Sequence, residues 1–551
     1  MALIVVILGA AFTAWCVDAS FNRGNLSSIP NYDDVTYFLS ATKVLEAFRS
    51  SGFHGVADVI HQRAAVLHSP YSTMLAAAAF ATLGYNDSSP YIFNFLAILL
   101  YLFFLCHILR DLPLTMRCAM MVFFLTLPFA TMAVVEFRPD LCWATLVGFC
   151  AVFGVSSRAY FDDWRQPAIH ALLFALSLLV KPSIFAMTIV VFGLSVCYQM
   201  AMALIDRREL SWRVIAKFAS IYMIVSFVIA GPYFIFFGVD IWDYFLKNLF
   251  GSNKEIWAYQ GDWLHQAGYY LAGGAAASNL GYSGWIAGCF FLTGTVAAIV
   301  RRDAAGMKLA GGLWGIVIPV YLINSLVDMK SPFVGAAFYS ILIFASACLW
   351  NNAVSAFLLR HPQSKRIWTA GMIALAVFSM MLYQWPQHSG RMASPLGRDF
   401  KYVGERVISA ISGLPLPKNP MIVFTQSGPV ICENIEMWFA MHNIPISIIN
   451  MSCFHDLAFE RVVSGADLIF LQDPGMMGAF LRLPFESLQA QLRRMVSADS
   501  RFKLIKTIKA LDGKYIYIYV NKRRIAASID SGGTTCSDQN VFPNHTDAAG
   551  H

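Results

Sequence analysis

The chain has 551 residues, of which 57% are hydrophobic, 14% aromatic and 13% charged. Soluble domains carry about 25% charged residues, so this composition excludes both a soluble globular protein and an intrinsically disordered one. The formal net charge of +7 fits lysine and arginine in loops beside a membrane better than a nucleic-acid surface. We therefore expect a polytopic α-helical membrane protein that binds no nucleic acid.

Apolar stretches long enough to cross the ~30 Å hydrocarbon core of a bilayer recur from the N-terminus onward. They cover residues 2–18, 91–109, 116–135, 140–157, 167–180, 182–205, 214–238, 279–300, 309–327, 332–350 and 368–385. A further run at 71–84 is too short to cross by itself. The first stretch lacks the charged start and cleavage site of a signal peptide, so we take it as a retained helix. The sequence thus predicts about eleven spans in a transmembrane domain over residues 1–388.

Basic residues gather in alternate loops between these stretches. They are Arg110, Arg117, Arg158, Arg165, Arg207, Arg208, Arg213, Lys217, Arg301, Arg302, Lys308, Arg360, Lys365 and Arg366. Because positive charge is enriched in cytoplasmic loops, these loops are expected inside. The N-terminus is then cytoplasmic, and two long loops, 19–90 and 239–278, are extracytoplasmic. The first loop contains helical patterns at 33–48 and near 53–66 that suit helices lying along the membrane interface.

From about residue 390 the composition becomes that of a soluble domain. Strand-like runs lie at 421–424, 446–449, 467–472, 502–508 and 514–520, and helical patterns lie near 430–442 and 485–497. This alternation predicts a small extracytoplasmic α/β domain over residues 389–525. The polar stretch 526–551 is predicted to be a disordered tail. Cys432 and Cys453 are free to pair in an oxidising compartment, but their spacing says nothing about geometry.

Ionisable residues at membrane depth are costly, so each one is a candidate for function. Asp33 and Asp34 follow the first span at the start of a predicted helix. Asp is a common helix N-cap, so this pair has a purely structural interpretation. Alternatively, one carboxylate acts as general base on a hydroxyl while the other binds substrate or a divalent cation.

The short loop Glu136-Phe137-Arg138-Pro139-Asp140 places three charges between two predicted spans. An internal ion pair is one interpretation, with Arg138 neutralised by Glu136 and Asp140. The other is a polar ligand, because charges with so little linker must lie beside the bilayer. His68 is open to the same two interpretations.

Lys181-Pro182 splits a long apolar region, and Lys330 lies in a late loop between predicted spans. Either lysine could simply reach the lipid headgroups. Neither has an acidic neighbour in sequence that clearly neutralises it, Asp328 being two residues from Lys330. We therefore expect these lysines, more than Arg138, to be available to an anionic ligand.

The order of these features resembles the GT-C superfamily of membrane glycosyltransferases, in particular the branch with protein O-mannosyltransferases and the enzyme that adds aminoarabinose to lipid A. The matching motifs are Tyr32-Asp33-Asp34 with Tyr37, His68-Ser69-Pro70-Tyr71 with Leu83-Gly84-Tyr85, and Arg138-Pro139-Asp140. Ser69 stands where the family usually has proline. The resemblance covers about residues 1–350 by motif order and the C-terminal domain only by position.

The resemblance implies a sugar donor linked to polyprenyl phosphate and an acceptor that is a glycolipid, glycan or protein. It also implies a bacterial inner membrane and a role in the cell envelope, such as lipopolysaccharide modification. Asp33 is the first choice for the base of an inverting displacement and Asp34 the second. The donor phosphate is expected at His68, Arg138, Lys181 and Lys330, and further substrate contacts at Tyr32, Tyr37, Glu136 and Asp140. A divalent metal ion at Asp33 and Asp34 is left open.

Two other functions remain as alternatives. A transporter or flippase of a polar lipid or glycan would use Lys181-Pro182 as a hinge in a broken helix, although no internal repeat supports it. A polysaccharide ligase or polymerase would also be a membrane protein, with a different order of motifs. Release of polyprenyl phosphate upon addition of acceptor distinguishes the enzymes from the transporter.

Overall fold

The protein is represented by a computed structural model that forms two compact units. The first unit comprises Met1–Ala19, Ile60–Ala79 and Ser88–His388, and the second Ser20–Val59, Phe80–Asp87 and Ser389–His551. The structure describes residues 1–23, 26, 32–61, 69–135, 137–157, 160–206, 211–251, 259, 261–382, 406–407, 409–411, 414, 416–417, 420–424, 436–437, 447–450, 458–473, 485–509, 515–524 and 526.

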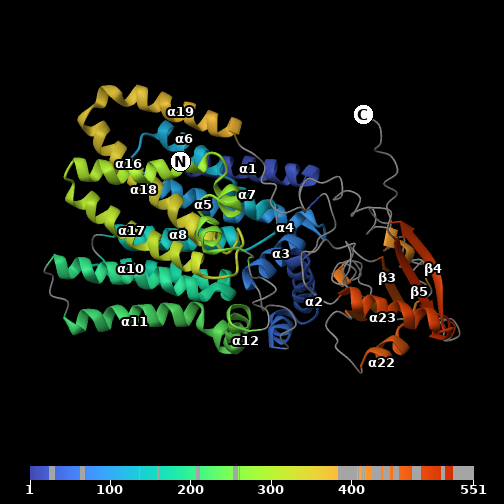
Figure 1. The fold of residues 1–551 in the computed structure, drawn as a ribbon. Coiled ribbons are helices and arrows are strands. Elements are labelled where there is room, and N and C mark those ends of the chain that lie inside the picture. Colours follow the sequence, from blue (N-terminus) through green and yellow to red (C-terminus); the bar gives the residue numbers. More distant parts are fainter. Residues whose placement is uncertain are drawn as a thin grey trace. The chain divides into compact units, whose positions relative to one another are not determined.

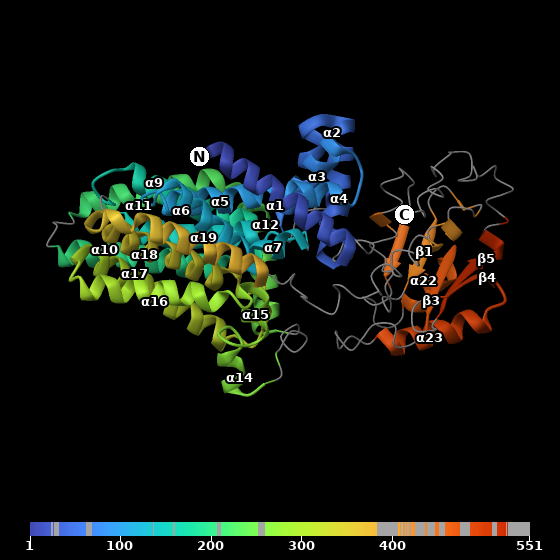
Figure 2. The same ribbon diagram turned by 90° about the horizontal axis from the view of Figure 1, so that it is seen from above.

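The described chain up to Leu382 is helical. Its elements are α1 (Ala2–Arg23), α2 (Tyr32–His61), α3 (Pro70–Leu83), α4 (Ser88–Phe93), α5 (Phe95–Ile108), α6 (Leu114–Leu125), α7 (Pro128–Val135), α8 (Asp140–Ser156), α9 (Arg165–Val180), η2 (Pro182–Ile184), α10 (Phe185–Ile205), α11 (Trp212–Ile229), α12 (Gly231–Leu249), α14 (Trp263–Gly268), α15 (Gly274–Leu280), α16 (Gly284–Val300), α17 (Ala304–Leu326), α18 (Ala336–Arg360), η3 (Pro362–Ser364) and α19 (Lys365–Leu382). Figures 1 and 2 show the long helices of the first unit running side by side.

The apolar helices confirm a multi-pass membrane protein. Within the described residues, seven helices are long and apolar enough to cross a membrane, or eight if the bent pair α15 and α16 is one span. Three shorter apolar helices, α6, α8 and α9, coincide with further predicted spans. The run at 71–84 forms the 14-residue α3, about 21 Å long at 1.5 Å per residue and shorter than the hydrocarbon core.

The predicted span 214–238 is divided in the structure. α11 ends at Ile229 and α12 begins at Gly231 with Pro232 in its first turn. Proline has no backbone N–H and favours the start of a helix, so a new helix begins here. α12 then continues to Leu249, into the region predicted to be a loop.

α8 is the centre of the first unit, and nearly all of its residues are buried. It packs against α18, α9, α10 and α5. Gly148 allows a close approach to α18, because a Cβ atom there would lie 2.9 Å from Phe344 Cδ2. Small residues of this kind let membrane helices approach closely.

In the second unit, α2 bends sharply where Gly52 adopts a positive φ of 60°. Five strands, β1 (Met421–Phe424), β2 (Ser447–Asn450), β3 (Leu468–Gln472), β4 (Phe502–Lys509) and β5 (Tyr515–Asn521), coincide with the five predicted runs. The sheet order is β2-β1-β3-β5-β4, in which β1 is parallel to β2 and β3, and β5 is antiparallel to β3 and β4.

Helix α23 (Phe485–Ala498) matches a predicted helix, whereas α22 (Ala458–Gly465) was not predicted. Val463, Leu492 and Val496 of these helices pack on one face of the sheet against Ile469 and Leu471. Val407, Ile411 and Leu416 cover the other face. Several predictions lie outside the described residues: His68, Glu136, Cys432, Cys453, most of the helix at 430–442 and the tail from 527 onward.

Candidate functional site

The first functional side chain is Asp140, in the first turn of α8. Pro139 precedes the helix and takes the N-cap position. The Asp140 side chain is only 2% exposed, and its Oδ1 atom accepts a hydrogen bond from Lys181 Nζ. Within the described part of the chain, Asp140 Oδ2 has no hydrogen-bond partner. A buried carboxylate oxygen in this state is open to a donor from a ligand.

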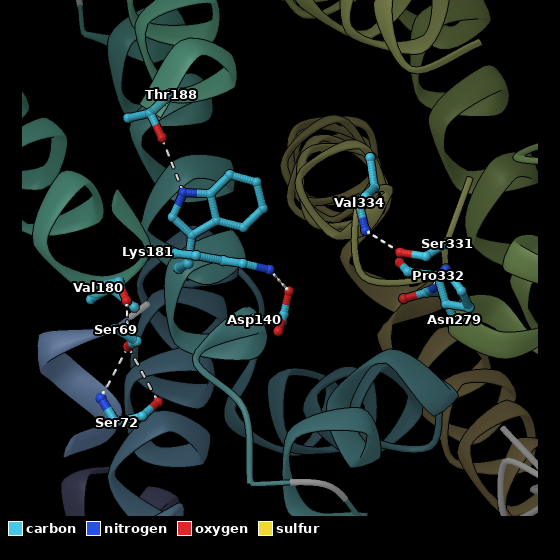
Figure 3. A network of polar contacts seen from close by, with 11 residues as sticks. Ser69, Ser72, Asp140, Val180, Lys181, Thr188, Asn279, Ser331, Pro332 and Val334 are labelled. Atoms are coloured by element: carbon cyan, nitrogen blue, oxygen red, sulfur yellow. Dashed lines mark hydrogen bonds and ion pairs between the residues drawn. The ribbon is translucent and has the colours of Figure 1, made fainter. Parts of the chain in front are cut away.

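Lys181 reaches Asp140 because the chain breaks between α9 and α10. α9 ends at Val180, and Lys181 leaves the helical conformation with φ −142° and ψ 79° before Pro182. Its side chain is 13% exposed and its Nζ lies 5.7 Å from the Trp143 ring centroid. The Trp143 indole donates to Thr188 Oγ1 at 3.0 Å. Figure 3 shows the Lys181 ammonium directed at Asp140.

This ion pair corrects one expectation. Lys181 has no clear acidic neighbour in sequence and was expected to be available to an anionic ligand, while an ion pair of Asp140 with Arg138 was one of two interpretations of its loop. The structure joins Asp140 to Lys181, although 41 residues separate them in sequence. The reason is that α8 and α9 are antiparallel neighbours, so the end of α9 returns to the start of α8.

Ser69 links the segment before α3 to the end of α9, next to Lys181. Its hydroxyl donates to the Val180 carbonyl oxygen at 2.8 Å and accepts the N–H of Ser72 at 3.1 Å. It is therefore linked to the residue before Lys181 (Figure 3). A proline at this position could not make these side-chain bonds, so the departure from the usual motif has a structural role that sequence reasoning missed.

Arg138 contacts the loop between α17 and α18, residues 327–335. The Arg138 guanidinium carbon lies 3.9 Å from the Phe333 ring centroid, which is a close cation–π contact. The loop therefore lies at the same end of the helix bundle as Asp140 and Lys181. Phe333 was not singled out from the sequence, because nothing local distinguishes it from other aromatic residues.

Lys330 lies in this loop, and its ammonium group donates hydrogen bonds to backbone carbonyl oxygens. It donates to the carbonyl oxygens of Asn324 at 2.7 Å, Ser325 at 2.8 Å and also Val327. Lysine has three N–H donors, and the Asn324 and Ser325 carbonyls are among the last ones of α17, which have no partner within the helix. Burial lowers the pKa of Lys330 to about 8, and nearby Asp328 partly opposes this shift.

The acidic pair after the first span lies at the start of α2. Asp34 is 2% exposed and Tyr37 is 6% exposed, and both belong to the second unit. The side chains of Tyr32 and Asp33 lie outside the described atoms.

Asp33, a candidate metal ligand, has its side chain outside the described atoms. Within the described residues, no group of three or more His, Cys, Asp and Glu side chains could hold a metal ion.

An apolar cavity of about 270 Å³ lies beside the Lys181 segment. Its lining residues come from α9, α10 and α12: Leu178, Phe185, Ile189, Phe234, Gly238, Ile241 and Trp242. Leu178 and Phe185 flank Lys181 in sequence. The cavity thus lies where the chain passes from α9 to α10, on either side of Lys181 in sequence.

Comparison with solved structures identifies the fold. The crystal structure of ArnT from Cupriavidus metallidurans bound to undecaprenyl phosphate matches with a TM-score of 0.54 and 12% sequence identity, covering 93% of this chain and 97% of ArnT. ArnT in the apo state matches with a TM-score of 0.52 over the same shares of the two chains and at the same identity. The chain has a GT-C-like fold.

The mycobacterial arabinofuranosyltransferase AftD matches less well. Its TM-score is 0.48 at 12% identity, with 93% of this chain and 40% of AftD covered, and this similarity is too weak to assign a fold. No protein-family model and no curated protein matches the sequence. The GT-C-like fold therefore comes from three-dimensional similarity, and it confirms the resemblance seen in the motif order.

Proposed function

We propose that this chain is a membrane glycosyltransferase that moves a sugar from a polyprenyl-phosphate donor to an acceptor hydroxyl on the extracytoplasmic face. The observation that carries the proposal is one end of the helix bundle that holds Arg138, Lys181 and Asp140, together with an apolar cavity whose lining residues Leu178 and Phe185 flank Lys181 in sequence. A phosphate on an isoprenoid chain has matching chemistry, because it combines a compact anion with a long apolar tail.

The cations have complementary tasks in this proposal. Arg138 presents a planar group that can bind two phosphate oxygens at once, and Lys181 supplies a point charge shared with Asp140. His68 is proposed as a further phosphate contact. Lys330 can reach the phosphate only by leaving its three carbonyl partners, so its direct role depends on a rearrangement of the loop.

The cavity between α9, α10 and α12 is proposed to hold the first isoprene units of the donor. Its lining is apolar, and Ile189 and Trp242 of the lining are exposed at the surface. The fold shared with ArnT supports this assignment, since that protein was crystallised with undecaprenyl phosphate.

The proposed reaction is a single inverting displacement. The acceptor oxygen attacks the anomeric carbon, the bond from that carbon to the phosphate oxygen breaks, and the lipid phosphate leaves with the electron pair. Asp33 takes the acceptor proton, with Asp34 as the second choice. The cations stabilise the charge that develops on the leaving phosphate. Tyr32, Tyr37, Glu136 and Asp140 are proposed to bind the sugar or the acceptor, and a divalent ion at the acidic pair remains part of the proposal.

Product release tests this function. Full-length protein in detergent would be incubated with undecaprenyl-phosphate-linked pentoses and hexoses and with lipid A, core oligosaccharide or a hydroxylated peptide as acceptor. The proposal predicts free undecaprenyl phosphate and a glycosylated acceptor. Movement of intact donor across a proteoliposome membrane without cleavage would identify a transporter instead.

Replacement of the base tests the mechanism. Asp33→Asn should lower turnover by about 10²- to 10⁴-fold, because an amide keeps the shape of the side chain but cannot accept a proton. Binding of undecaprenyl phosphate should be unchanged. Asp58→Asn, an exposed position on the same helix, is the matched control. If Asp33→Asn keeps more than about a tenth of turnover, the base is assigned wrongly and Asp34→Asn is the next variant.

A further inference from the structure

Phe333 lies under the Arg138 guanidinium, with 3.9 Å between the guanidinium carbon and the ring centroid. We infer that Phe333 is a positioning residue for donor recognition: its ring fixes the plane of the Arg138 guanidinium so that two N–H groups meet the lipid phosphate together. This inference rests on the proposed function and names a specificity-determining residue that no motif contains.

An aromatic partner and an acidic partner act on different parts of an arginine side chain. The N–H donors of arginine all lie in the plane of the guanidinium, and a ring stacked on that plane contacts only its face. Stacking therefore orients the group without using its donors. A carboxylate partner would occupy the same N–H edge that a phosphate needs.

The ring itself is held in place by its loop. The Pro332 carbonyl, next to Phe333, accepts a hydrogen bond from Asn279 Nδ2 at 3.3 Å. The Ser331 hydroxyl oxygen accepts the N–H of Val334 at 3.1 Å, and the Phe333 carbonyl accepts the N–H of Ala336 at 3.2 Å. Figure 3 shows Asn279, Ser331, Pro332 and Val334 grouped around this turn.

Further interactions hold the segments that carry Arg138 and Phe333. Lys330 binds the carbonyl end of α17, and the Asp328 carbonyl accepts the Tyr259 N–H at 2.9 Å. On the other side, Phe137, the neighbour of Arg138, is fully buried, with its ring centroid 6.0 Å from that of Tyr91. The chain beside Arg138 and the chain beside Phe333 are thus both held by packing or hydrogen bonds, as a preorganised anion site requires.

The test measures binding of two lipids to full-length protein in detergent by tryptophan fluorescence. Undecaprenyl phosphate carries the phosphate, and undecaprenol has the same tail without it. Phe333→Leu should weaken binding of undecaprenyl phosphate about three- to tenfold and leave undecaprenol binding unchanged. Phe333→Tyr, which keeps the ring, should bind as the wild type does. Phe338→Leu is the matched control, because Phe338 contacts Tyr321 and Tyr339 instead of Arg138.

A double-mutant cycle separates positioning from a general structural effect. Arg138→Lys should weaken undecaprenyl phosphate binding by itself, and adding Phe333→Leu should weaken it no further. The inference is overturned if Phe333→Leu binds normally, if the two losses multiply, if undecaprenol binding falls equally, or if Phe338→Leu gives the same loss. Normal binding by Phe333→Leu together with a loss in Arg138→Lys would overturn only the inference. Absence of undecaprenyl phosphate binding to the wild type would overturn the proposed function as well.

Discussion

At the scale of single residues, the candidate site is built around the buried ion pair Asp140–Lys181. Removing two charges from water is costly, and their attraction offsets this cost only while both partners are present. Within the described structure, Asp140 Oδ2 accepts no hydrogen bond, so the hydrogen-bonding capacity of this carboxylate is only partly used. Such a site is suited to a polar ligand and sensitive to loss of either charge.

Asp140→Asn should therefore destabilise the protein strongly, because it leaves the Lys181 ammonium buried without a counter-charge. The expected loss is about 3–5 kcal/mol in the free energy of unfolding. The control is Asp206→Asn, which breaks the ion pair of Asp206 with Lys308, both about 40% exposed, and should cost less than about 1 kcal/mol. Thermal unfolding in detergent measures both.

The double variant Asp140→Leu with Lys181→Met sharpens this comparison. Replacing a whole buried pair with apolar side chains removes the unpaired charge, so stability should recover relative to Asp140→Asn. Donor binding should not recover, because Lys181 is proposed to contact the phosphate. Recovery of both properties would argue that the pair is purely structural.

The lowered pKa of Lys330 predicts that the stability of the protein depends on pH. Burial lowers its pKa in the folded protein to about 8, from an ordinary value of 10.5. The unfolded chain then binds more protons between these values, so the free energy of unfolding should rise with pH across this window. The destabilisation caused by burying the charged Lys330 ammonium group is fully present below pH 8. Lys330→Met should lack this rise, as seen in the difference between the melting temperatures of wild type and variant from pH 7.5 to 10. Parallel pH profiles for the two proteins would contradict the assignment.

At the scale of elements, the close packing of α8 on α18 positions the site. Asp140 begins α8, and Phe333 precedes α18 by three residues, so any separation of these helices displaces both ends of the site. Gly148 lies at a close contact between them, where a methyl group would meet Phe344 and Ser340.

Gly148→Ala should lower stability by about 1–3 kcal/mol, because the added methyl group overpacks a helix contact. Gly193→Ala on α10 is the matched control, since a Cβ atom there meets no atom within 4 Å. That substitution should be neutral, or stabilising by up to about 1 kcal/mol, because alanine favours helix. Equal effects at the two positions in thermal unfolding would show that α8 and α18 are not tightly packed.

The elements also show which local signals were reliable. The helical patterns at 33–48 and 53–66 were predicted as two segments, and the structure joins them as α2 with a bend at Gly52. Glycine at a positive φ accounts for the bend. α22 was missed, because its eight residues are too short for a clear helical period.

At the scale of the whole molecule, membrane orientation is a testable prediction. The basic loops are expected inside, so Arg301, after α16, should face the cytoplasm, and Lys247, near the end of α12, should face outside. Phe245, close to Lys247, lies against Phe185 at the Lys181 end of the bundle, with 5.1 Å between the ring centroids.

Cysteine labelling measures this orientation. In a background without the native cysteines, an impermeant reagent added from outside should modify Lys247→Cys and leave Arg301→Cys unmodified until the membrane is opened. Labelling of both from outside would contradict the predicted topology. Labelling of Arg301→Cys alone would place the candidate site on the cytoplasmic side.

The sequence by itself determined the class of protein, the positions of the apolar helices and the five strands. These properties depend on local hydrophobicity, on periodicity and on residues such as Pro182, and all of them act over a few neighbouring positions. It also singled out Arg138, Asp140, Lys181 and Lys330, because charge at membrane depth is visible in one dimension.

Only the tertiary structure decided how these residues are partnered. Lys181 pairs with Asp140, Lys330 binds carbonyls of α17, and Arg138 stacks on Phe333. The strand order β2-β1-β3-β5-β4 was equally invisible in the sequence. The physical reason is that a contact between distant segments depends on how helices and strands pack. Before the chain folds, each charged side chain could pair with many others at similar free energy, and the sequence does not say which pair forms.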